Sequence, residues 1–183
     1  MKNLVYISIL SLALVSCNSS NQNQTSNSNE SSVIGSGTLD NGNKIKIVAG
    51  DTKNEQVWVD YIKAHNERDL DKIAEINADD WEGYTADGSV VKGSDTHIEI
   101  LDNWFKTANP KWEIKWMIAN AAENEDGVVV QWLTTGNDYT DTDENGNEIF
   151  EHNIHDIQFV DGKIKRINVY SRAKAQESAE FSY

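Results

Sequence analysis

The sequence is poor in cysteine and proline, with one copy of each, Cys17 and Pro110. A single thiol excludes an intramolecular disulfide, even in an oxidising compartment. A single proline leaves the rest of the chain free to form continuous helices and strands. The sequence also lacks the G-x-S-x-G nucleophile motif, phosphate loops and dinucleotide fingerprints. It therefore carries no signature of nucleotide binding or of serine-hydrolase chemistry.

Basic residues are also scarce. The chain has 16 Lys and Arg residues against 30 Asp and Glu residues, which gives a formal net charge of -14. A protein this acidic is repelled by nucleic acid and by anionic lipid, so we expect no nucleic-acid partner. Attachment to a membrane would have to come from something other than surface charge.

Residues 4–15 form an apolar stretch that is too short for the ~20 residues of a membrane-spanning helix. The stretch follows Lys2 and has the length of a signal-peptide core. It ends in Leu14-Val15-Ser16-Cys17, which resembles the lipobox of bacterial lipoproteins. The resemblance implies a signal peptide at 1–16 and a mature chain that begins with acylated Cys17. An ordinary secretory peptide and a buried cysteine in a core helix are the alternatives.

Residues 17–32 follow as a polar stretch, and no residue from 18 to 32 is apolar. Such a segment cannot bury enough surface to offset its ordering entropy, so we expect a disordered tether. Asn18 stands where an aspartate would retain an enteric lipoprotein at the inner membrane. The resemblance therefore implies a protein held to the outer membrane of the bacterial cell envelope through Cys17.

The rest of the chain is long enough for one domain with its own core. Residues 33–50 predict a short hairpin around Asn41-Gly42. Apolar periodicity predicts helices at 55–67, 69–76 and 94–107, and a period of two predicts strands after Pro110. Together these elements predict an α+β domain at 51–175, with three N-terminal helices packed in a strongly curved antiparallel sheet. Residues 176–183 are predicted to be a frayed tail.

One stretch of this domain resembles a known superfamily. It runs from Tyr61 to Ile73 (YIKAHNERDLDKI) and is followed by Ala78-Asp79-Asp80. Together with Val91-Lys92-Gly93 and Asp161-Gly162-Lys163-Ile164, it resembles the nuclear transport factor 2-like superfamily, which includes ketosteroid isomerases and SnoaL-like cyclases. The resemblance implies a cone-shaped fold, in which a bent sheet wraps three helices and an apolar pocket opens at the wide end.

The same resemblance suggests catalytic roles for particular residues. Tyr61 falls where ketosteroid isomerases place a tyrosine that donates a hydrogen bond to the substrate oxygen, and His155 falls where they place a second acid. Thr85 falls near the position of their aspartate base, and threonine cannot abstract a carbon-bound proton at neutral pH. A ketosteroid isomerase activity is therefore rejected, while Tyr61 and His155 stay candidate catalytic residues.

Strand alternation predicts the lining of the pocket. If His155 points inward, its neighbours of the same parity and the matching residues of two other strands do so as well. These pocket-lining residues are Val128, Val130, Trp132, Ile157, Phe159, Ile167 and Val169. Such a wall suits a small, largely apolar ligand bound without catalysis. The alternatives are a metal-independent isomerase, cyclase or dehydratase that uses Tyr61 and His155, and a structural interaction domain whose core is filled.

The sequence also bears on metals, cofactors and oligomers. The histidines have no spacing typical of a zinc site, so we expect no metal and no cofactor. Residues 141–147 resemble the start of an EF-hand loop, but position twelve is His152, so an acidic hairpin tip is the simpler reading. Superfamily members often pair through the outer sheet face, which implies a homodimer to which Trp112, Trp116 and Tyr170 would contribute.

Overall fold

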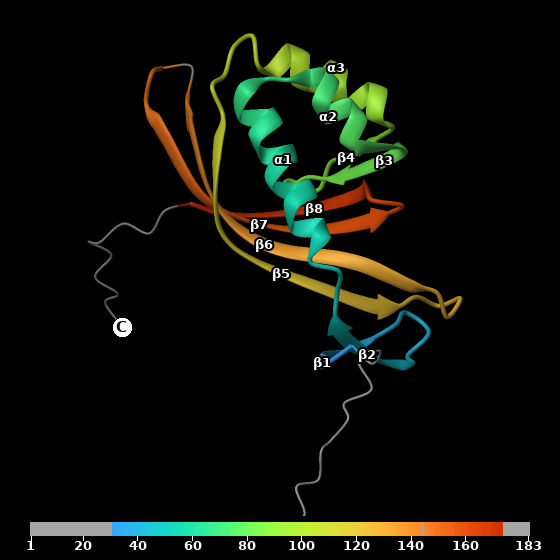
Figure 1. Ribbon diagram of the computed structural model, residues 1–183. Coiled ribbons are helices and arrows are strands. Elements are labelled where there is room, and N and C mark those ends of the chain that lie inside the picture. Colours follow the sequence, from blue (N-terminus) through green and yellow to red (C-terminus); the bar gives the residue numbers. More distant parts are fainter. Residues whose placement is uncertain (1–30, 144, 174–183) are drawn as a thin grey trace, which may run out of the picture. The chain divides into compact units, whose positions relative to one another are not determined.

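The computed structural model describes residues 31–143 and 145–173 (Figure 1). The predicted signal peptide, the acylation site Cys17, nearly all of the tether and the predicted tail lie outside these residues. Within the described ranges, no helix has both the length and the apolarity needed to cross a bilayer.

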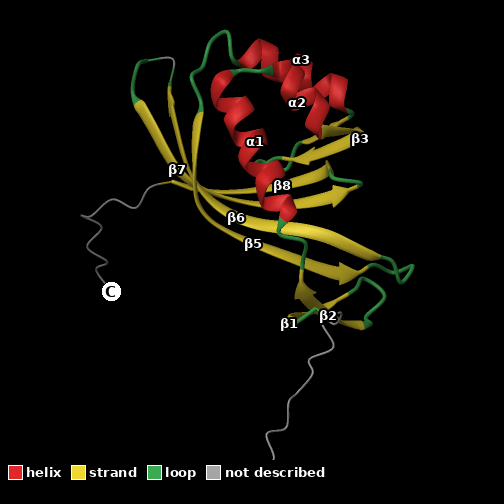
Figure 2. Cartoon of the chain, viewed as in Figure 1, coloured by secondary structure: helices red, strands yellow, loops and turns green. Residues whose placement is uncertain are grey.

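The elements follow one another as strand hairpin, helices, short strands, helix and a four-stranded meander (Figure 2). In chain order they are β1 (Val33–Thr38), β2 (Lys44–Ala49), α1 (Lys53–Glu67), α2 (Leu70–Ile76), β3 (Asn77–Tyr84), β4 (Val90–Lys92), α3 (Ser94–Trp104), β5 (Lys111–Glu123), β6 (Val129–Thr142), β7 (Glu148–Val160) and β8 (Lys163–Ala173).

All eight strands belong to one curved sheet in the order β1-β2-β5-β6-β7-β8-β3-β4, and the helices cover one of its faces (Figure 1). We call this helix-covered side the inner face and the opposite side the outer face. The α+β class is confirmed, but two details of the prediction are wrong. The helices are not N-terminal, since β1 and β2 precede them, and the sheet is not wholly antiparallel, since β3 runs parallel to β8.

The predicted hairpin is an integral part of this sheet. β2 pairs with the last third of β5, from Ile47 opposite Ala122 to Ala49 opposite Asn120. The turn of the hairpin also contacts the β5–β6 turn, where Asn41 N–H donates to Glu125 Oε1 at 3.2 Å. The hairpin therefore extends the sheet beyond β5.

Residues of the Asn66-to-Asp71 turn determine where α1 ends and where α2 begins. Arg68 has a positive φ of 62°, which ends α1, and Asp69 Oδ1 accepts from Lys72 N at 2.9 Å, which caps α2. Asn66 ties this turn to the sheet: its Oδ1 accepts from Trp112 N at 2.9 Å and its Nδ2 donates to Trp112 O at 2.8 Å. The turn is therefore held against the start of β5.

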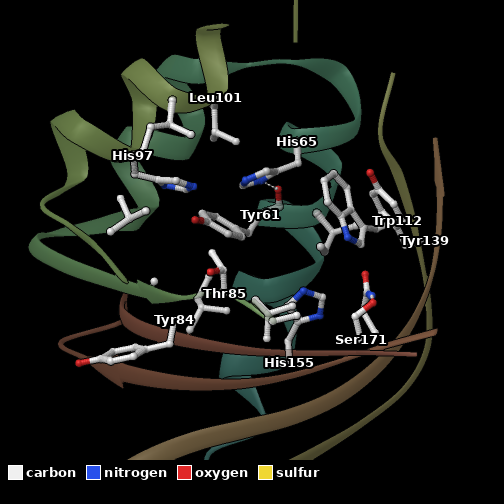
Figure 3. Close-up of a pocket in the computed structure, with 18 of the residues that line it drawn as sticks. Tyr61, His65, Tyr84, Thr85, His97, Leu101, Trp112, Tyr139, His155 and Ser171 are labelled. Atoms are coloured by element: carbon white, nitrogen blue, oxygen red, sulfur yellow. Dashed lines mark hydrogen bonds between the residues drawn. The ribbon is translucent and has the colours of Figure 1, made fainter. Parts of the chain in front are cut away.

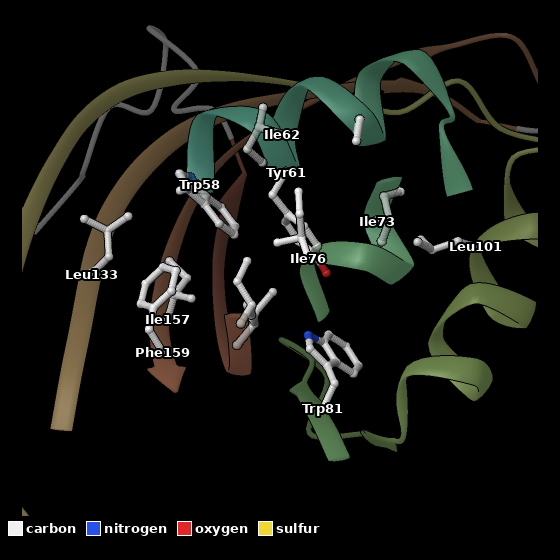
Figure 4. Packing of buried hydrophobic residues seen from close by; sticks show 13 residues of the cluster. Trp58, Tyr61, Ile62, Ile73, Ile76, Trp81, Leu101, Leu133, Ile157 and Phe159 are labelled. Carbon is white, nitrogen blue, oxygen red and sulfur yellow. The ribbon is translucent and has the colours of Figure 1, made fainter. Parts of the chain in front are cut away.

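The core lies between the helices and the inner face (Figure 4). Ile73, Leu133, Ile157 and Ile164 have no exposed surface, and Trp58 and Tyr61 of α1 are 1% and 2% exposed. Burial of each such side chain contributes about 1.5–3 kcal/mol. Trp58, Tyr61, Ile62 and His65 form the buried stripe of α1, because residues three and four apart share a helix face.

The long strands depart from simple alternation at one point. A β-bulge between Ile114 and Trp116 shifts the parity of β5. Trp112 and Ile114 therefore pack with the inner core, whereas Trp116 and Ile118 lie on the outer face and are 43% and 52% exposed. The expectation that Trp112 and Trp116 share an outer face is wrong for this reason.

Candidate functional site

A cavity of about 480 Å³ opens between the helices and the inner face of the sheet (Figure 3). This volume lies within the range of small-ligand pockets. The elements around the cavity are α1, α3, β3, β4 and strands β5 to β8. Its lining is largely aromatic and aliphatic, and includes Trp58, Ile62, Trp81, Val91, Leu101, Trp104, Trp112, Ile167 and Val169. A filled core, one of the three readings of the sequence, does not fit a cavity of this size.

Tyr61 is fixed deep in the wall by a chain of hydrogen bonds. Its hydroxyl donates to Asn77 Oδ1 at 3.0 Å, and Asn77 Nδ2 donates to Ser94 Oγ and to His97 Nδ1, each at 3.2 Å. Burial raises the pKa of Tyr61 well above its ordinary value, and the nearby Trp81 indole opposes this shift. Tyr61 is therefore a neutral phenol whose proton is directed at Asn77.

Two further histidines, His65 and His97, line the cavity beside Tyr61, with ring centroids 5.9 Å apart. His65 Nδ1 donates to Tyr61 O at 2.9 Å, and the ring of His97 stacks on Trp81 at 3.9 Å. Burial lowers the pKa of His65 to about 4 and that of His97 to about 3. Both imidazoles are therefore neutral at neutral pH.

His155 lines the sheet side of the same cavity, 5.2 Å from Trp58 between ring centroids. Asn137 Nδ2 donates to His155 Nδ1 at 2.9 Å, so the remaining proton of the neutral ring is on Nε2. Burial lowers the pKa of His155 to about 3. Burial thus moves the pKa of His155 away from the natural value at which the enzymatic alternative would use it as an acid or base.

The sheet wall becomes more polar from one end to the other, as the strand registers show. Residues in the same row lie directly opposite one another on neighbouring strands. The row Ala119-Leu133-Ile157-Ile167 is apolar, and the row Met117-Thr135-His155-Val169 is mixed. Polar side chains predominate in the rows Ile114-Asn137-Asn153-Ser171 and Trp112-Tyr139-Glu151. Figure 3 shows Trp112, Tyr139 and Ser171 on the same side of the cavity.

The residues predicted to line the pocket divide into three groups. Ile167 and Val169 line the cavity, as do Tyr61 and His155, and Ile157 and Phe159 lie in the core beside it. Val128 precedes β6 and is 57% exposed, and Val130 and Trp132 lie on the outer face of β6, so the prediction is wrong for these three. Leu133 pairs with Ile157 and Thr135 pairs with His155, so the odd-numbered residues of β6 face inward there and the even-numbered ones face outward.

Thr85 lies at the exposed mouth of the cavity. Its Oγ1 is 2.5 Å from Asp87 Oδ1 and 3.0 Å from Ser89 O, so the hydroxyl serves the β3–β4 turn. No base chemistry follows from this residue. Among the residues that the structure describes, no three His, Cys, Asp or Glu side chains are grouped to hold a metal ion.

Several lining residues are absent from the predicted pocket lining, notably Trp58, Trp81, His97 and Glu151. Trp58 lies three residues before Tyr61, and this helical spacing was a usable signal. Glu151 has the same parity as His155 on β7, which was a second signal. Trp81 and His97 come together only through the packing of α3 on β3, for which the sequence has no local pattern.

Comparison with known proteins gives a family and a fold. The model of the SnoaL-like domain matches residues 58–167. No curated protein sequence matches the chain.

Solved structures are similar in fold at low identity. A putative ketosteroid isomerase from Kribbella flavida DSM 17836 is 11% identical, with a TM-score of 0.53 over 68% of this chain and 81% of that one. An LEH-like epoxide hydrolase from M. tuberculosis is 14% identical, with a TM-score of 0.55 over 66% and 84%.

An NTF2-like protein of unknown function from Burkholderia pseudomallei K96243 is 16% identical, with a TM-score of 0.53 over 67% of this chain and 92% of that chain. These likenesses show a shared NTF2-like fold. Because the family model covers more than half of the chain, the chain belongs to the SnoaL-like domain family.

Proposed function

We propose that this protein is a lipid-anchored domain of the bacterial cell envelope that binds a small, largely apolar ligand without transforming it. The observation that carries the proposal is the cavity of about 480 Å³ with its aromatic and aliphatic lining. Such a lining, with a few fixed polar groups, is typical of small-molecule sites. The anchor rests on Leu14-Val15-Ser16-Cys17 and the polar segment that follows it.

The polar groups of the cavity support binding better than catalysis. His155 lines the cavity and keeps its Nδ1 lone pair for Asn137. The carboxylate on the wall, Glu151, lies four residues from His155 on β7, which is about 13 Å along a strand. The two groups therefore lie two rows apart on the cavity wall.

A fluorescent apolar probe tests the cavity. N-phenyl-1-naphthylamine should bind the purified protein with a stoichiometry near one and increase its emission. Val169→Phe fills part of the cavity and should weaken binding at least about 10-fold. Val160→Phe, at an exposed position of β7, is the matched control and should leave binding unchanged. Equal binding by both variants would contradict the proposed site.

The anchor is tested separately. Mass spectrometry of the protein from bacterial membranes should find an acylated N-terminal Cys17, and Cys17→Ala should leave an unprocessed or soluble product. An unmodified Cys17 thiol in the membrane fraction would refute the anchor and leave the ligand site untouched.

A further inference from the structure

We propose that the ligand carries a protonated amine, which Glu151 binds at the polar end of the cavity while the apolar body fills the rest. This inference rests on the proposed ligand-binding function and specifies its ligand class. Trp112, Tyr139 and Glu151 are directly paired residues of β5, β6 and β7, and all three face the cavity. Paired side chains on one face are close enough to bind one group together.

Glu151 is positioned rather than free. Its Oε2 accepts from Asn153 Nδ2 at 3.3 Å and from the hydroxyl of Ser171. Both donors are uncharged and lie in the next row of the wall. They hold the side chain, and within residues 31–143 and 145–173 Glu151 forms no ion pair with Lys or Arg.

Cations are lacking on the cavity wall. Among the described residues that line the cavity, none is Lys or Arg, and its three histidines are neutral at neutral pH. Two described basic residues near this end, Lys111 and Arg68, are directed elsewhere. Lys111 Nζ donates to Asn66 O, and Arg68 donates to Asn109 Oδ1 and lies over the ring of Phe105 at 5.0 Å.

Aromatic rings adjoin the carboxylate. The ring centroids of Trp112 and Tyr139 are 5.2 Å apart, and Trp104 packs edge-on against Trp112 at 5.9 Å. Faces of tryptophan and tyrosine attract ammonium groups, most strongly where water is excluded. A carboxylate beside such rings therefore favours an ammonium group over a hydroxyl or a carboxylate.

A second negative charge reinforces the same end. Asp141, which is 8% exposed, accepts from the hydroxyl of Tyr139 at 2.8 Å. Burial, together with the carboxylates of Asp141 and Glu151, raises the pKa of Tyr139 above its ordinary value. The excess of acidic over basic residues in the whole chain would also raise the local concentration of a cationic ligand.

Three probes with one body and different charges test the inference on the full chain carrying Cys17→Ser. They are 4-phenylbutylamine, 4-phenylbutanol and 4-phenylbutyrate, and their dissociation constants are measured by calorimetry at neutral pH. The amine should bind at least about 10-fold more tightly than the alcohol, and the carboxylate most weakly. In Glu151→Gln, the affinity for the amine should fall to the affinity for the alcohol. The dissociation constant of the alcohol should stay within about twofold of its wild-type value.

Glu123→Gln, at the exposed end of β5, removes the same charge away from the cavity and should change neither affinity. Circular dichroism checks that Glu151→Gln folds, and the glutamine carbonyl can still accept from Ser171. Equal binding of amine and alcohol would overturn the inference while the apolar ligand site stands. Failure of all three probes would also overturn it, and the naphthylamine probe then decides whether the site itself fails.

Discussion

At the residue scale, Asn66 links the sequence signature to the fold. The HNERDLD segment contains an α1 end at Arg68, an α2 cap at Asp69 and the double hydrogen bond from Asn66 to Trp112. The asparagine side chain replaces a missing neighbouring strand, because this first half of β5 is not paired with β2. The motif therefore anchors Trp112, which belongs to the cavity wall.

Asn66→Ala should destabilise the protein by about 2 kcal/mol, because it leaves both the N–H and the C=O of Trp112 without a partner in a half-buried setting. Urea unfolding at neutral pH measures the change in unfolding free energy. Asn103→Ala on the exposed side of α3 is the control and should cost less than about 0.5 kcal/mol. Equal effects of the two substitutions would show that the Asn66 contacts contribute nothing.

The sequence predicts which residues belong to the site better than it predicts their chemical state. Tyr61 and His155 could be chosen from the sequence because the family resemblance supplies their positions and strand parity supplies a direction. The neutral state of His155 could not, because it depends on burial under Trp58 and on Asn137 from another strand. His97 likewise meets Trp81 only after α3 has packed on β3.

At the scale of elements, the strands were easier to find than to orient. The alternation of Trp112, Ile114, Trp116 and Ile118 predicts one face, and the bulge after Ile114 divides them between two. In β6 both phases of the alternation contain large apolar residues, such as Trp132 in one and Leu133 in the other. The hydrophobic pattern alone therefore does not show which set of residues faces the core. The register of β6 with β7 determines this face.

The β1–β2 hairpin should protect the edge of β5. Removal of residues 1–50 uncovers the edge of β5 from Asn120 to Ala122. The loss of these three paired positions should lower the free energy of unfolding by about 1–2 kcal/mol. An unpaired edge also favours association between chains. The shortened chain should therefore unfold at lower urea concentration and scatter more light than a chain lacking only residues 1–32. Identical behaviour would show that the hairpin is dispensable.

At the scale of the whole molecule, the outer face bears an apolar row that suits pairing of two copies. Trp116, Gly136, Ile154 and Tyr170 lie opposite one another on β5 to β8, and Tyr170 is 62% exposed. Homodimerisation therefore stays a prediction, with Trp112 removed from the proposed interface. Sedimentation at micromolar concentration should give a dimer that Tyr170→Glu converts to monomer, while Val90→Glu on β4 should not. A monomeric wild-type protein would contradict the prediction.

The buried histidines His65 and His155 and the half-buried His97 should make the whole protein sensitive to acid. Their folded-state pKa values are about 4 for His65 and about 3 for His97 and His155, whereas an unfolded imidazole has a pKa near 6.5. The depressed values mean that the unfolded chain binds protons first. Stability is therefore complete above about pH 6.5 and is lost as the pH falls toward the folded-state values.

Between pH 7 and pH 5, each histidine should lower the free energy of unfolding by about 1–2 kcal/mol. Most carboxylates titrate below this pH range. The urea midpoint should fall steeply over this range, and His97→Gln should reduce the dependence by about a third, since glutamine takes up no proton. The comparison uses the pH slope within each variant, so a general loss of stability in His97→Gln does not affect it. A wild-type midpoint that is the same at pH 7 and pH 5 would show that these imidazoles are not buried in the neutral form.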